Sequence, residues 1–138
     1  MTPGGRRHRV VAFGVFDLLH PGHLRFLEQA RKLGTELVVV VTRDARARRE
    51  KGRAPVLSEM ERLSMVRALK CVDRAILGDK PGVNLILRRL KPEMIALGHD
   101  QQIPRGLGGN WRYVRLLASL RRRYSASNIR KALSRYTL

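Results

Sequence analysis

The sequence of 138 residues is poor in cysteine, in aromatic residues and in acidic residues. Its single cysteine, Cys71, excludes an internal disulfide framework and a zinc site built from several cysteines. Aromatic residues make up 5% of the chain, and neither a zinc-finger spacing nor an aromatic RNA-binding motif is present. No pair of carboxylates is placed in the pattern of a general acid and a general base.

Long apolar runs are also missing, since no run approaches the ~20 residues that span a bilayer, and no membrane partner is expected. The basic N-terminus is not followed by an apolar segment with a cleavage site, so we expect a cytoplasmic location. Hydrophobic residues form 43% of the chain, which is enough for the core of one domain. We expect a flexible basic arm over residues 1–8 and a single domain over residues 9–138.

The formal net charge of +18 is large for a chain of this length. It indicates either a solvated basic surface or a face that binds phosphates, those of a nucleotide or those of a nucleic acid. Most of the positive charges are arginines, whose planar guanidinium groups suit phosphate binding. Because the sequence carries no nucleic-acid-binding motif, a nucleic acid is not the favoured partner.

Apolar β-type runs alternate with helical patterns along the chain. The patterns predict strands over residues 10–15, 37–42, 74–77 and 94–97, and helices over 22–33, 44–51, 58–69 and 83–90. This alternation is typical of a parallel α/β sheet. Residues 113–117 fit either a fifth strand or one face of a helix, and residues 127–134 fit a final short helix capped by Ser127.

The ends of these helices carry recognisable signals. We expect Gly34 to close the first helix as a C-cap and Asp44 to cap the second. Ser58 and Glu61 have the spacing of a capping box at the start of the third helix. We expect the core side of that third helix to consist of Met60, Leu63, Met65, Val66 and Leu69.

The stretch GVFDLLHPGH, residues 14–23, lies where the first strand gives way to the first helix. Ligands of parallel α/β sheets bind beyond the carboxyl ends of the strands, and a helix N-terminus there offers free N–H groups to an anion. Gly14 lets the backbone approach a ligand closely, because it has no Cβ. The sequence therefore predicts an anion site at this junction.

The histidines His20 and His23 are three residues apart in this stretch, with Pro21 and Gly22 between them. We expect both imidazoles to face the same anion, where each donates a hydrogen bond to a phosphate oxygen. The alternative is that His20 only caps the turn and that His23 only packs. Two histidines at this spacing and at this junction favour phosphate chemistry.

GVFDLLHPGH resembles the G-T-F-D-x-x-H-x-G-H signature of the cytidylyltransferase-like nucleotidyltransferases, with Val15 in place of the threonine. The segment 124–130, YSASNIR, resembles their second signature, I-S-S-T-x-I-R. The finer pattern is most similar to archaeal FAD synthases, on the stretches 43–44, 51–55, 65–69, 72–78 and 97–101. The resemblance implies a single Rossmann-like domain with a five-stranded parallel sheet flanked by helices, and hence a fifth strand at 113–117.

The same resemblance implies the transfer of AMP from ATP to FMN, which yields FAD and pyrophosphate, with Mg²⁺ or another divalent cation, in a homodimer. One alternative is a CTP-dependent cytidylyltransferase that acts on glycerol phosphate or another polyol phosphate, because such enzymes share the first signature. An alternative of another class is a basic nucleic-acid-binding protein that retains the fold. The intact pair of histidines argues against this last alternative.

The resemblance also implies roles for individual residues. His20 and His23 would be catalytic, because they would hold the triphosphate and stabilise the transition state at the α-phosphorus. The nucleotide site would consist of Gly14, Val15, Phe16, His20, Pro21, Gly22, His23, Gly98, Asp100, Ser125, Ser127 and Arg130. Candidate contacts to a phosphate or to the acceptor are Asp17, Arg48, Lys51 and Arg62. No metal ligand is assigned, and Trp111 and Tyr113 are more readily explained by packing than by stacking on a ligand ring.

Overall fold

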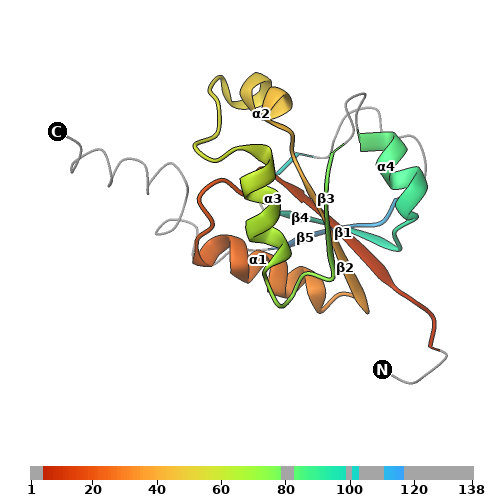
Figure 1. Ribbon diagram of the computed structural model, residues 1–138. Coiled ribbons are helices and arrows are strands. Elements are labelled where there is room, and N and C mark those ends of the chain that lie inside the picture. Colours follow the sequence, from red (N-terminus) through yellow and green to blue (C-terminus); the bar gives the residue numbers. More distant parts are fainter. Residues whose placement is uncertain (1–4, 79–82, 99–100, 103–110, 117–138) are drawn as a thin grey trace.

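The computed structural model describes residues 5–78, 83–98, 101–102 and 111–116 of the chain (Figure 1). The elements are β1 (Arg9–Gly14), α1 (Pro21–Arg31), β2 (Glu36–Val41), α2 (Asp44–Lys51), α3 (Glu59–Arg67), β3 (Arg74–Leu77), α4 (Val83–Leu90), β4 (Met94–Gly98) and β5 (Tyr113–Leu116). The predicted alternation of strands and helices is confirmed, and the ambiguous segment after residue 111 forms a strand. The helix predicted over 127–134 lies outside the described residues, and the boundary of the basic arm stays a prediction.

The five strands form one parallel sheet in the order β3-β2-β1-β4-β5. The central strand β1 pairs on both sides, so that Val11 lies opposite Val38 of β2 and Ile95 of β4. Helices cover both faces of such a sheet, which explains why the strands are almost continuously apolar. The chain runs outward from β1 to β2 and β3 on one side and to β4 and β5 on the other. Ligands of such sheets bind beyond the carboxyl ends of the strands at this reversal, which lies here between β1 and β4.

Two apolar clusters fill the faces of the sheet. On one face α1 and α3 contribute Leu27, Leu63 and Val66, which pack with alternate residues of β1 and β2 (Figure 1). On the other face α4 contributes Leu87, and Trp111 and Tyr113 pack against the same cluster. The packing interpretation of these two aromatic residues is therefore supported.

The expected core side of α3 is wrong in part. Met60 and Met65 are 58% and 50% exposed, whereas Arg62 is completely buried. Leu63 and Val66 belong to the core as expected, and Leu69 packs against it. Hydrophobicity alone assigns the methionines to the interior, but the buried face of α3 consists of Arg62, Leu63 and Val66. The polar contacts of Arg62 are described below.

The predicted helix ends are confirmed at one position and corrected at two. The Ser58 hydroxyl accepts from the Glu61 N–H, and the Glu61 carboxylate accepts from the Ser58 N–H, which is the predicted capping box. Gly34 does not cap α1, which ends at Arg31 with Lys32 as its C-cap. A Cβ on Gly34 would lie 2.3 Å from the His8 carbonyl oxygen, so glycine is needed there for close packing. Asp44 is the first residue of α2 rather than its cap, and its carboxylate bonds to α3 instead.

Among the described residues, no helix is long and apolar enough to cross a membrane.

Candidate active site

The loop between β1 and α1 has an unusual backbone. Phe16 and Leu18 adopt left-handed conformations, with φ of 54° and 53°, which cost free energy for residues with a side chain. The Phe16 ring turns back over Gly14, and a Cβ on Gly14 would lie 2.7 Å from that ring. Gly14 therefore makes room for Phe16, which is 4% exposed, and its contact with a nucleotide stays a prediction. The loop holds a strained shape around a buried aromatic ring.

His20 caps the helix that follows this loop. Its Nδ1 accepts hydrogen bonds from the N–H groups of Gly22, at 3.1 Å, and His23, at 3.4 Å. Since Nδ1 accepts, a neutral His20 carries its proton on Nε2, which remains a donor. Pro21 has no N–H, and the Leu24 N–H donates to the His20 carbonyl. The expectation of free N–H groups at this helix start is therefore wrong, and the imidazoles are the donors that remain for an anion.

The two imidazoles lie together, as the sequence predicts. The rings of His20 and His23 stack with centroids 3.7 Å apart and planes 21° apart. The edge of the Phe16 ring meets His23 at a centroid distance of 5.5 Å. One oxyanion at this edge of the sheet can therefore receive hydrogen bonds from both histidines.

Both histidines are less basic than an exposed histidine. Burial lowers the pKa of His23 to about 4, with repulsion from His20 and Lys51 acting in the same direction and Asp17 acting against them. Burial also lowers the pKa of His20. Near neutral pH both rings are therefore uncharged donors in the free protein. The buried Nδ1 of His23 has no partner among the described residues, which is typical of a site completed by a ligand.

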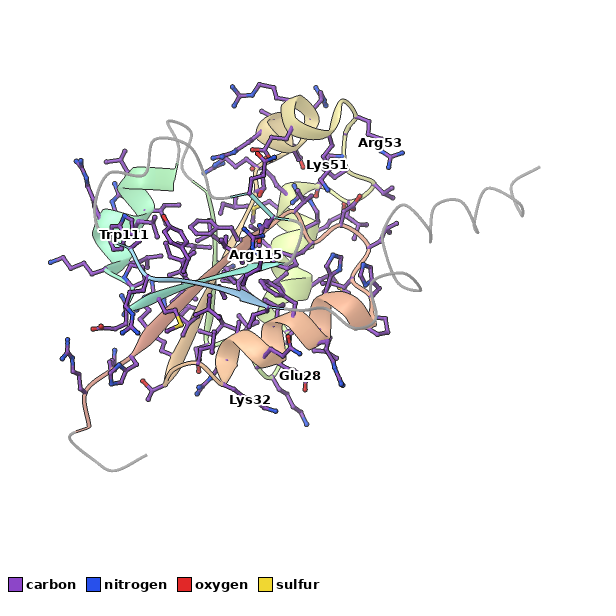
Figure 2. All side chains as sticks on the ribbon, turned by 180° about the vertical axis from the view of Figure 1, so that it is seen from behind. Glu28, Lys32, Lys51, Arg53, Trp111 and Arg115 are labelled. Atoms are coloured by element: carbon purple, nitrogen blue, oxygen red, sulfur yellow. The ribbon has the colours of Figure 1, made fainter. Side chains whose placement is uncertain are left out.

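Basic side chains gather at the end of α2 and in the loop that follows it. Lys51 ends α2 and Arg53 follows in the loop, well separated from Glu28 and Lys32 of α1 (Figure 2). Lys51 is near enough to His23 to influence its pKa. Lys51 and the candidate Arg48 are both exposed, and within the described ranges neither forms an ion pair. Contacts of Lys51 and Arg48 with a phosphate stay predictions.

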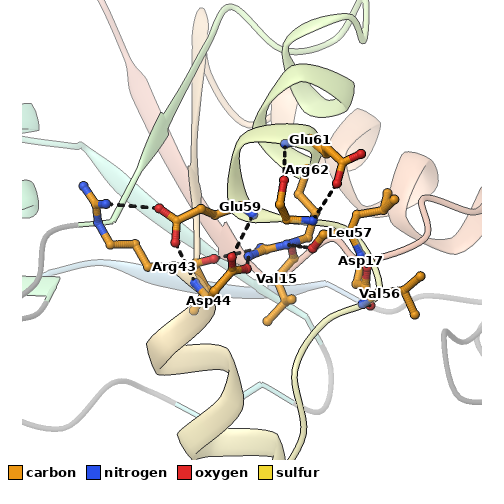
Figure 3. Close-up of polar contacts among 11 residues, drawn as sticks. Val15, Asp17, Arg43, Asp44, Val56, Leu57, Glu59, Glu61 and Arg62 are labelled. Atoms are coloured by element: carbon orange, nitrogen blue, oxygen red, sulfur yellow. Dashed lines mark hydrogen bonds and ion pairs between the residues drawn. The ribbon is translucent and has the colours of Figure 1, made fainter.

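Asp17 and Arg62 are buried and bonded to the protein itself. The two oxygens of Asp17 accept the N–H groups of Val56, at 2.8 Å, and Leu57, at 3.0 Å. Arg62 donates to backbone carbonyls, including that of Val15, and to Asp44 (Figure 3). Arg62 has no exposed surface, so the expectation that it contacts a phosphate is not met.

Gln101, a glutamine for which the sequence predicts no role in the site, connects the carboxyl end of β4 to that of β1. The Gln101 amide donates to the Phe13 carbonyl at 2.8 Å and accepts the Gly98 N–H at 3.0 Å. Arg115 of β5 donates to the carbonyls of Gly98 and Gln101. The sequence signals for Gln101 are its position directly after β4 and its place in the stretch 97–101, which carries part of the family resemblance. Both backbone polar groups of Gly98 are thus engaged within the protein.

Four predicted site residues, Asp100, Ser125, Ser127 and Arg130, lie outside the described residues, and their roles stay predictions. Within the described ranges, no group of three histidine, cysteine or acidic residues is arranged to hold a metal ion. The acid nearest to the histidines in the chain, Asp17, already receives two backbone N–H groups.

Comparisons with known proteins agree with this geometry. The cytidylyltransferase-like family model matches residues 11–133. The FAD synthase of Archaeoglobus profundus is 45% identical over 127 residues, which cover 86% of this chain and 81% of that protein. The FAD synthase of Methanopyrus kandleri is 54% identical over 98 residues, which cover 69% of this chain and 65% of that protein.

A solved structure is also similar. The crystal structure of a protein from Thermoplasma volcanium, described as a lipopolysaccharide core biosynthesis protein, superposes with a TM-score of 0.74 at 42% identity. The match covers 80% of this chain and 97% of that one. The five-stranded parallel architecture is thus shared with a known structure.

Proposed function

The chain belongs to the cytidylyltransferase-like family of nucleotidyltransferases and, within it, groups with the FAD synthases, and on this premise we propose that it transfers AMP from ATP to FMN. The products are FAD and pyrophosphate. The observation that carries the proposal is the stacked pair His20 and His23 at the edge of the sheet where the order of the strands reverses.

The reaction requires positioning and charge stabilisation more than covalent help. A phosphate oxygen of FMN attacks the α-phosphorus of ATP, while the bond from that phosphorus to the bridging oxygen breaks and pyrophosphate leaves with the electron pair. His20 donates its Nε2–H to the phosphate oxygens, and His23 donates beside it. The positive charges of Lys51, Arg48 and Arg53 offset the charge that moves onto pyrophosphate.

Binding of a polyanion also changes the pKa values of the two histidines. An adjacent negative charge favours the protonated imidazole, so a bound triphosphate raises the pKa of both rings above their values in the free protein. The burial that keeps His23 neutral when the site is empty then makes its interaction with phosphate stronger. The divalent cation is part of the substrate, Mg-ATP.

A grid of substrates tests the proposal. ATP or CTP is combined with FMN or glycerol phosphate at fixed ionic strength, and pyrophosphate and the nucleotidyl product are both measured. We expect FAD from ATP and FMN, and turnover lower by several powers of ten with CTP, since hydrogen bonds to a base edge discriminate strongly. Equal or faster turnover with CTP and glycerol phosphate would identify a polyol-phosphate cytidylyltransferase instead.

The same purified protein tests the alternative that the chain is a basic nucleic-acid-binding protein. A nucleic-acid-binding protein would release no pyrophosphate and would bind RNA or DNA with a steep dependence on salt. We propose that the protein is cytoplasmic, because the cell interior supplies its substrates. We also propose that it is a homodimer, and sedimentation equilibrium measures the mass of the assembly.

A further inference from the structure

Arg62 joins four separate segments at the edge of the site. Its guanidinium donates to the carbonyl of Val15 after β1, at 2.7 Å, and to that of Thr42 after β2, at 2.8 Å. It also donates to the Leu57 carbonyl, at 3.1 Å, and to the Asp44 carboxylate at the start of α2, at 2.6 Å (Figure 3). A single buried cation thus fixes the ends of two strands, the start of one helix and the segment before another.

Asp17 makes a second connection between the same regions. Its carboxylate lies in the loop after β1 and accepts the N–H groups of Val56 and Leu57 from the segment between α2 and α3 (Figure 3). Leu57 is therefore held twice, through its N–H by Asp17 and through its carbonyl by Arg62. The segment that follows α2 is bound to the loop that leads to His20.

Packing alone does little to hold α2. Ala47 is its only buried residue, and most of its other side chains are charged. The loop on the opposite side of this connection holds Phe16 and Leu18 in left-handed conformations, which persist only where surrounding contacts fix them. The helix α2 and the loop after β1 therefore depend on polar contacts, which include those of Arg62 and Asp17 and, at the start of α2, those of Glu59.

We propose that Arg62 is a positioning residue for the transfer reaction: together with Asp17 it holds α2 and the segment after it against the loop that leads to His20, and so places Lys51 beside the histidine pair. Its effect on turnover rests on the proposed function, whereas its effect on geometry does not. Arg62 acts through other residues and contacts no substrate.

The charges that surround His23 make this placement measurable. The groups that act on its pKa are His20 and Asp17 from the loop and Lys51 from α2, in addition to burial. When α2 moves away, the repulsion from Lys51 weakens and water enters. Both changes raise the pKa of His23 from about 4 toward its ordinary value of 6.5.

Arg62→Lys is the first test, because it keeps the positive charge but replaces the branched group with a point donor. We expect a folded variant in which NMR titration gives a higher pKa for His23, and in which kcat falls by up to ~10²-fold with a smaller change in KM. Arg67→Lys is the matched control, since Arg67 lies in the same helix, is exposed and donates to one carbonyl, that of Ala75. The control is expected to leave the pKa and kcat unchanged.

A double-mutant cycle identifies the route of the effect. Lys51→Ala alone raises the pKa of His23, and adding Arg62→Lys to it produces a smaller further rise than Arg62→Lys produces in the wild type. If Arg62→Lys does not fold, Asp44→Ala removes one partner of the guanidinium at a position whose side chain is 36% exposed. It is expected to raise the pKa of His23 in the same direction and by less.

Two results would overturn the proposal. One is an Arg62→Lys or Asp44→Ala variant of lower stability whose His23 keeps a pKa of about 4, because Arg62 would then be structural only. The other is an equal rise of the pKa with and without Lys51. A wild-type protein that forms no FAD would refute the proposed function, but the titration would still decide the positioning role.

Discussion

The two helices that pack on the same face of the sheet begin in different ways. α3 begins with a capping box of Ser58 and Glu61, and its first turn holds two acidic residues, Glu59 and Glu61. α1 begins with an imidazole, that of His20, and its first turn holds no acidic residue. Acids at a helix start offset the positive end of the helix dipole. The start of α3 is thus arranged for stability, whereas the start of α1 keeps its positive potential for an anion.

The largest expected difference between the two helix starts is in their response to pH. In the unfolded chain His23 titrates near 6.5, and in the folded protein near 4. Between these values the unfolded state binds more protons, so the free energy of unfolding falls as the pH falls from 6.5 to about 4. The expected loss is about 3 kcal/mol. Urea denaturation at a series of pH values measures this loss. If the free energy of unfolding of a His23→Asn variant depends on pH as steeply as that of the wild type, the loss does not come from His23.

Capping and chemistry can be separated at His20. Asparagine caps helices well, so His20→Asn is expected to keep the start of α1 and the stability of the protein. Its kcat is expected to fall by ~10²-fold or more, because the Nε2 donor is lost. The kcat values of His20→Ala and His23→Ala are expected to fall by as much. Thermal unfolding and FAD formation are measured on the same samples. Near wild-type turnover in His20→Asn would mean that the imidazole serves only as a cap.

Ser58→Ala tests the other helix. The loss of the hydroxyl cap is expected to lower the free energy of unfolding by about 1 kcal/mol. Turnover per folded molecule is expected to stay unchanged, because Ser58 only supports α3. A large fall in kcat without loss of stability would show that the two helix starts do not differ in role as described.

The smallest effect is expected from making the two starts alike. Leu24→Glu places an acid near the first turn of α1, at a side chain that is 41% exposed. It is expected to weaken binding of a non-hydrolysable ATP analogue by two- to fivefold, which corresponds to about 0.3–1 kcal/mol. Leu24→Gln is the neutral control. Identical affinities for the two variants would show that the charge of the first turn does not matter.

The local signals in the sequence predict this fold well. The apolar runs give four of the five strands, and the spacing of Ser58 and Glu61 gives the cap of α3, because each depends on neighbours within a few residues. The fifth strand, which the pattern leaves open between strand and helix, follows only from the family resemblance. The pairing of His20 with His23 follows in the same way from their position at a strand-to-helix junction. Structural features that depend only on residues close together in the chain are therefore predicted correctly from the sequence.

The errors concern contacts between distant residues. Arg62 displaces Met60 and Met65 from the interior because its acceptors come from Val15 and Thr42, which no periodicity within α3 reveals. Gly34 resembles a helix cap, but a glycine is needed there because the His8 carbonyl, just before β1, leaves no room for a Cβ. A hydrophobic pattern assigns a buried side chain to the core, but it does not recognise a buried cation.

The central claim is that His20 accepts with one ring nitrogen to start α1 and donates with the other to the triphosphate. The most direct test is ¹⁵N NMR of its two ring nitrogens near neutral pH, before and after addition of a non-hydrolysable ATP analogue. The account predicts an unprotonated Nδ1 and a protonated Nε2 in the free protein, with the Nε2 resonance shifted by the analogue. A proton on Nδ1, or an Nε2 resonance that the bound analogue leaves unchanged, would contradict it.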